Sequence, residues 1–199
     1  MLQRLTPNWV YGGFLAGILL FALAPMVLAG WSAPLAATFL LLPAYMIHQY
    51  EEHDHDRFRR FFNEKFCGGF DALTVFAVFI VNVPGVWGLI ALSLYCAASF
   101  GLGWALFAVY LVLVNAVIHI AHSILFRCYK PGLATAVVVF VPMGAIALVL
   151  IDRAGGASVA SHAIAFFTAV ALHAAIVLHV RRTFIAERRR QGVASGGAK

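Results

Sequence analysis

The chain has 199 residues, of which 63% are hydrophobic and 11% charged, and its formal net charge is +6. Soluble domains average roughly 45–50% apolar and about 25% charged residues, so this composition excludes an ordinary soluble domain. The basic residues form short clusters beside apolar runs, which favours lipid headgroups as their partner and argues against nucleic acid.

Six apolar runs follow one another along the chain, and a helix needs about 20 mostly apolar residues to cross a bilayer. They are residues 9–29, 35–50, 72–100, 104–126, 133–151 and 157–180. The third run contains Asn82-Val83-Pro84-Gly85, where we expect a kink in one helix rather than two separate spans. The sequence predicts an all-α, polytopic transmembrane helical bundle of about six spans, with a single domain over residues 1–190 and a disordered tail over residues 191–199.

The basic residues also predict the orientation of this bundle. Six spans put both termini on one side, together with the loops near residues 53–70 and 127–132, and of all lysines and arginines only Arg153 falls on the other side. Because cytoplasmic loops carry the excess of Lys and Arg, both termini are expected to be cytoplasmic. We expect the protein in the inner (plasma) membrane of a bacterium. Residues 57–62 alternate arginine with phenylalanine, which is typical of a helix lying on the headgroup layer.

A stripe of ionisable residues lies at the end of the second span. On a helix, His48, Glu51, Glu52 and His55 occupy relative positions 0, 3, 4 and 7, which is one face. His53 falls off this stripe and is expected to be solvated or salt-bridged.

A second stripe lies at the end of the fourth span, where Asn115, His119 and His122 again occupy positions 0, 4 and 7. The predicted topology places both stripes near the cytoplasmic face. Charge bias and residue spacing are separate observations, and together they predict a single site.

Carboxylates and imidazoles are a ligand set suited to zinc, iron or manganese. We therefore expect a divalent metal, zinc or iron, as the cofactor. The candidate ligands are His48, Glu51, Glu52, His55, His119 and His122. A glutamate that does not bind the metal, Glu51 or Glu52, could act as a general base.

Three motifs together resemble the HXXEE domain family. They are His48-x-x-Glu51-Glu52, a later histidine on an Asn-x-x-x-His stretch, and Tyr129-Lys130-Pro131-Gly132, in this order within roughly residues 11–150. The resemblance implies that His48, Glu51, Glu52, Tyr129, Pro131 and Gly132 are family positions. His119 fits the further histidine better than His122, which stays an alternative. The function of that family is not established, so the resemblance points to a site and not to a reaction.

Residues 129–132 also predict a tight turn between the fourth and fifth spans. Tyr129 is either part of a structural hairpin or a contact to substrate, and we count it with Glu51 and Glu52 as a candidate catalytic residue.

The leading hypothesis is a metal-dependent membrane enzyme, a hydrolase or transferase, acting on a lipid or other apolar substrate. One alternative is a di-iron membrane oxidoreductase resembling hydroxylases, although the chain lacks their dense histidine clusters. Another is a non-enzymatic metal or solute transporter, although no inverted repeat is evident. A structural subunit would leave the carboxylate pair unexplained.

Overall fold

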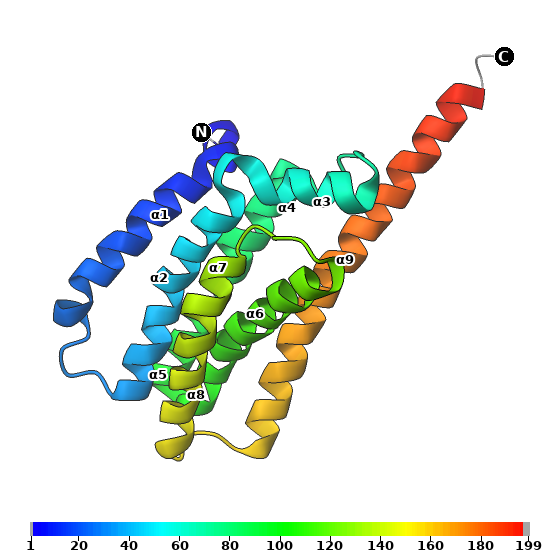
Figure 1. Ribbon diagram of the computed structural model, residues 1–199. Coiled ribbons are helices and arrows are strands. Elements are labelled where there is room, and N and C mark those ends of the chain that lie inside the picture. The colour runs from blue at the N-terminus through cyan, green and yellow to red at the C-terminus, as the bar shows by residue number, and fades with distance from the viewer. Residues whose placement is uncertain (1, 197–199) are drawn as a thin grey trace.

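The computed structural model describes residues 2–196, which form helices joined by short turns, without a strand in that range. The elements, in chain order, are α1 (Leu2–Val27), α2 (Ala33–His53), η1 (Asp54–Asp56), α3 (Arg57–Cys67), α4 (Val75–Ile80), η2 (Val81–Trp87), α5 (Gly88–Phe100), η3 (Leu102–Ala105), α6 (Leu106–Phe126), α7 (Leu133–Thr135), η4 (Ala136–Phe140), α8 (Val141–Arg153) and α9 (Val159–Gly196). They make a bundle of long helical rods that run up and down beside one another (Figure 1).

Five of these rods are long and apolar enough to cross a membrane. They are Gln3–Val27, Val75–Phe100, Leu102–Phe126, Leu133–Arg153 and Val159–Arg190. The prediction of an all-helical fold with several helices long and apolar enough to span a membrane is therefore confirmed. The helix α2 is less apolar because its last turns carry His48, Gln49, Glu51 and Glu52.

The third predicted span is one continuous helical run, as expected, and not two helices. Around Pro84 the chain changes from α-helix to the π-helical η2 and then resumes as α5. A proline lacks the backbone donor of a regular helical turn, and π-helical turns commonly appear where the regular pattern is interrupted. Asn82 within η2 is buried and accepts a hydrogen bond from the Gln49 side chain of α2, 2.9 Å away.

The core of the bundle surrounds α2, which packs against α1, α5, α6 and α8. The buried side chains at these contacts include Leu41, Ile90, Val109 and Phe140. Burying α2 on several sides carries the polar end of this helix into the bundle interior. This packing determines where the candidate site forms.

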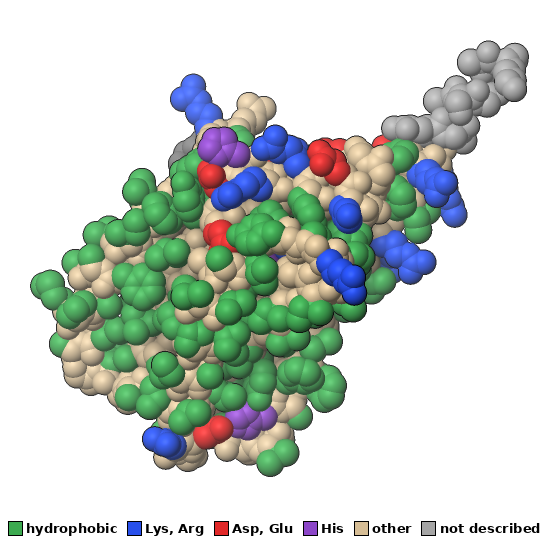
Figure 2. Space-filling view, in the orientation of Figure 1, with side chains coloured by type: hydrophobic (Ala, Val, Ile, Leu, Met, Phe, Trp, Pro, Cys, Tyr) green, Lys and Arg blue, Asp and Glu red, His purple; other side chains and the backbone are tan. Residues whose placement is uncertain are grey.

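The charged residues gather at one end of the molecule. The start of α1, the short helix α3 and the end of α9 all lie at this end (Figure 1). Figure 2 shows most Lys, Arg, Asp and Glu side chains there, whereas hydrophobic side chains cover most of the remaining surface in view. The helix predicted around residues 57–62 is present as α3 and crosses this end.

The tail predicted to be disordered covers residues 191–199. The helix α9 continues to Gly196. Residues 197–199 lie outside the described residues.

Candidate functional site

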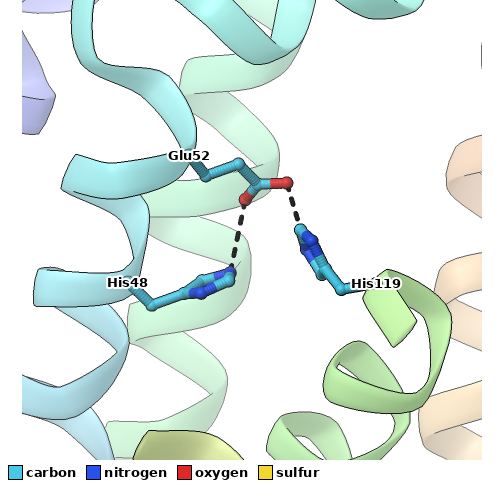
Figure 3. A group of neighbouring side chains, drawn as sticks. All are labelled: His48, Glu52 and His119. Carbon is cyan, nitrogen blue, oxygen red and sulfur yellow. Dashed lines mark ion pairs between the residues drawn. The ribbon is translucent and has the colours of Figure 1, made fainter. Parts of the chain in front are cut away.

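Three residues from two helices meet at the polar end of α2. His48 and Glu52 lie one turn apart on α2, and His119 comes from α6 (Figure 3). All three are buried, with 0%, 6% and 1% of their surface exposed. The Nε2 atom of His48 lies 3.6 Å from Oε2 of Glu52, and Nε2 of His119 lies 3.3 Å from Oε1. One carboxylate thus faces two imidazoles.

This group could hold a metal ion. One ligand atom from each residue lies within 4.8 Å of the others. Ligands at the usual zinc distances of about 2.0–2.1 Å in tetrahedral geometry are roughly 3.3–3.4 Å apart. Charge-assisted hydrogen bonds, by comparison, are shorter, about 2.7–2.9 Å. The separations of 3.3 and 3.6 Å are therefore closer to a ligand set than to direct hydrogen bonds.

A chain of hydrogen bonds assigns the proton of His48. The Thr135 hydroxyl donates to Oε2 of Glu51 at 2.5 Å, so its oxygen accepts from Nδ1 of His48 at 2.8 Å. A neutral His48 then carries its lone pair on Nε2, which is buried without a hydrogen-bond partner among the described residues. This lone pair faces the Glu52 carboxylate, and a cation between the two would remove their repulsion. Histidines that bind metals usually donate their other N–H in this manner.

Glu51 does not join this group. Its carboxylate accepts hydrogen bonds from the backbone N–H of Ala134 and Thr135, at 3.1 and 2.8 Å, and from the Tyr129 hydroxyl. These N–H groups belong to the first turn of the helical run that starts at Leu133, where unpaired donors favour a negative charge. Glu51 therefore fastens α2 to the start of α7.

The Tyr129-Lys130-Pro131-Gly132 turn forms one wall of the site. Gly132 has φ +91°, and a Cβ atom there would lie 2.6 Å from Cε1 of His119 and 2.8 Å from Cε1 of His48. A larger residue would therefore collide with both histidines and strain the backbone. Burial and the hydrogen bond to Glu51 raise the pKa of Tyr129 to about 12, so its hydroxyl remains a donor at neutral pH. The turn is a structural hairpin that also shapes the site.

Lys130 is a functional candidate that the sequence did not single out, although it occupies the variable position of the turn motif. Its side chain is buried and its Nζ lies 5.0 Å from the centre of the Phe58 ring. Burial lowers the pKa of Lys130, and the negative charge of Glu52 partly opposes this shift. A buried ammonium beside the histidines adds positive charge to the site.

His53 was expected to be solvated or salt-bridged, and the structure shows the second of these alternatives. His53 is buried, and its Nε2 lies 3.3 Å from Oε2 of Glu52. The rings of Trp9 from α1 and Phe58 from α3 lie 5.3 and 5.4 Å from its ring and cover it. Helix spacing could not reveal the burial of His53, because the covering residues come from other helices.

The expectation that His55 continues the helical stripe is wrong. The α-helix ends at His53, and His55 has φ +51°, so its side chain leaves the stripe. That side chain is 77% exposed and pairs with Asp54 at 2.9 Å. This pairing lowers the pKa of Asp54.

His122 lies outside the group that contains His119. Its ring packs against Phe66 and Phe126, with centroids 5.2 and 4.5 Å away. Although it lies only three residues beyond His119 on α6, its ring enters this aromatic cluster and does not join the group of His48, Glu52 and His119. Of the two alternatives for the further histidine, the structure brings His119 to His48 and Glu52.

One of three comparisons with known proteins identifies a family. Curated proteins and solved structures give no significant match. A family model described as "Protein of unknown function with HXXEE motif" matches residues 39–147, more than half of the chain. The matched segment contains His48, Glu52, His119 and the turn at residues 129–132. The chain therefore belongs to the HXXEE family.

Proposed function

We propose that this protein is a metal-dependent integral membrane enzyme, a hydrolase or transferase acting on a lipid or another apolar substrate. The observation that carries the proposal is the buried Nε2 of His48, which has no hydrogen-bond partner in residues 2–196 and faces Glu52 beside His119. Two imidazoles and one carboxylate match the ligands of catalytic zinc sites, and a similar set binds iron in non-haem enzymes.

In the proposed topology, α2 is a sixth span, both termini are cytoplasmic, and the membrane is the inner membrane of a bacterium. The grouping of charged side chains at the end that carries the site supports this orientation (Figure 2). The site would then open toward the cytoplasmic headgroup layer, where the polar part of a lipid lies.

Each residue of the site has a role in the proposal. His48, Glu52 and His119 hold the metal, which when bound would polarise an ester or phosphoryl oxygen and make water more acidic. His53 lies 3.3 Å from Glu52 and is the group placed to take up a proton. The buried ammonium of Lys130 would stabilise developing negative charge. Glu51, Thr135 and Tyr129 hold this arrangement in place.

A single metal is favoured over a di-iron centre because Glu51 is not placed as a bridging ligand. Its oxygens already accept bonds from Tyr129, Ala134 and Thr135. The core around α2, α5, α6 and α8 is built mostly from apolar side chains. This supports an enzyme site at one end of the bundle over a transport path through it.

Elemental analysis of the detergent-purified protein, prepared without chelators, tests the proposal. We expect close to one zinc or iron per chain in the parent, and its loss in His48→Ala and His119→Ala. His162→Ala is the matched control, because this histidine pairs with Asp152 at the end where α8 stops and α9 starts. A parent without stoichiometric metal, or site variants that keep it, would overturn the proposal.

A further inference from the structure

A groove runs along the outside of the bundle beside the candidate site. It has a volume of about 380 Å³ and lies between the end of α6 and the start of the next helical run. Ile120, Ile124, Leu133 and Val137 give it apolar walls. Pockets for small ligands usually measure roughly 300–1,000 Å³.

The groove faces the hydrocarbon if these helices cross a membrane. Ile124 is 70% exposed and Val137 48% exposed, and both belong to candidate spans. An acyl chain is therefore the chemistry that fits its walls.

Polar groups gather at the end of the groove nearest the charged end of the molecule. Arg127 directly follows the last residue of α6, which places it at headgroup depth, and it also lines the groove. It is exposed, and its guanidinium makes no hydrogen bond or ion pair within residues 2–196. A guanidinium without a partner is suited to a phosphate.

A second polar group lies four residues earlier. Ser123 lines the groove, and its hydroxyl oxygen is buried and has no hydrogen-bond partner among the described residues. At a rise of about 1.5 Å per residue, it lies roughly 6 Å deeper than Arg127. In a phospholipid, the ester carbonyls are also deeper than the phosphate.

We propose that this groove binds an anionic phospholipid, with the phosphate at Arg127, an ester carbonyl at Ser123 and an acyl chain against Ile120, Leu133 and Val137. This proposal rests on the proposed function, because it names an anionic phospholipid as the substrate class of the proposed metal site. Tyr129 connects the two places, since it lines the groove while its hydroxyl donates to Glu51. The bound headgroup would therefore lie against the turn whose other face contacts His48 and His119.

Native mass spectrometry tests the binding without any assay of activity. The detergent-solubilised protein would be offered equal amounts of phosphatidylglycerol and phosphatidylcholine with identical acyl chains. Both lipids carry the phosphate, but only phosphatidylcholine adds an ammonium group, which the positive charge of Arg127 would repel. We therefore expect the parent to prefer the anionic lipid by about tenfold. Arg127→Gln should abolish this preference, and Ser123→Ala should weaken binding of both lipids. Arg153→Gln is the matched control and should bind like the parent.

Two further measurements identify the occupant. Val137→Trp would fill the groove and should reduce binding of both lipids, whereas glycerol phosphate, which has no acyl chain, should not displace the lipid. A parent without a preference, an Arg127→Gln protein that keeps it, or displacement by glycerol phosphate would each overturn the proposal.

The same samples separate this proposal from the metal site. If the parent holds stoichiometric metal but lipid binding is unchanged in Arg127→Gln, only the proposed lipid site is overturned. Lipid binding that depends on Arg127 in a protein without stoichiometric metal would support the lipid site and overturn the proposed function.

Discussion

Glu51 and Glu52 are neighbours in the chain, but their carboxylates have different partners. Glu52 faces imidazoles, with His119 and His53 each 3.3 Å away. Glu51 points to the start of α7 and accepts hydrogen bonds from two backbone N–H groups there. Successive residues of an α-helix point about 100° apart, which accounts for the separation. The glutamate pair of the family motif therefore combines a candidate metal ligand with a clamp between α2 and α7.

This difference predicts different effects for the two glutamine variants. Glu52→Gln removes the only carboxylate of the proposed metal group and should abolish stoichiometric metal binding. Glu51→Gln leaves that group intact but weakens the hydrogen bonds that orient His48 through Thr135. Changes to such outer partners usually cost about 10- to 100-fold in metal affinity. Loss of the helix cap should also cost about 1 kcal/mol of stability.

Chelator competition and thermal unfolding of both variants measure these effects. Equal metal affinity in the two variants would contradict the division of roles between the glutamates.

Gly132 gives a second prediction. In Gly132→Ala, the new Cβ would meet Cε1 of His119 and of His48 at 2.6 and 2.8 Å, in addition to the strain of φ +91°. We expect loss of metal and a lower melting temperature. Gly30→Ala is a matched control, since Gly30 has φ +81° and no atom near the position of its Cβ. The Gly30→Ala protein should show only the cost of backbone strain, about 1–2 kcal/mol, and should keep its metal. A Gly132→Ala protein that also keeps its metal and loses no more stability than Gly30→Ala would argue against contact between the turn and the histidines.

The sequence predicted much of this site because part of it follows from local spacing. His48 and Glu52 are four residues apart on one helix, so helical periodicity alone places them together. His119 followed from the distribution of basic residues, which put the ends of the second and fourth spans on the same side. Contacts of Thr135, Lys130 and His53 could not be predicted, since they depend on how neighbouring helices are rotated and on the course of a turn.

The prediction for His55 was wrong because of the local backbone conformation. His55 and Asp56 both have positive φ, at 51° and 61°, although neither is a glycine. The sequence offers no glycine or proline there to signal that the helix ends. Arg59 donates to Asp56 at 2.7 Å, so an ion pair with the following helix helps to hold this turn.

Phenylalanine variants of the two α6 histidines should behave in opposite ways. His122 already packs among the rings of Phe61, Phe66 and Phe126. His122→Phe should therefore keep its metal and unfold at the same or a higher temperature. His119→Phe should lose its metal, because its Nε2 lies beside Glu52. Metal analysis of the two purified variants tests this prediction. Loss of metal in His122→Phe but not in His119→Phe would show that His122, and not His119, is the ligand.

Lys130 predicts how the stability of the metal-free protein depends on pH. Burial lowers its pKa in the folded state below the usual 10.5. Between this lowered value and about 10.4, the unfolded chain holds more protons at this position, so the free energy of unfolding should rise with pH. Lys130→Met removes this contribution and should flatten the rise.

Melting temperatures of parent and variant between pH 7 and pH 10 measure the difference. The buried Cys67 has a raised pKa and acts in the opposite direction, but it contributes equally to both proteins and cancels. Tyr129, whose pKa is raised to about 12, would lower stability only above about pH 10, where an unfolded tyrosine ionises. Lys65→Met, at an exposed position on α3, should keep the slope of the parent. A Lys130→Met protein with the same slope as the parent would show that the Lys130 ammonium is not buried in the folded protein.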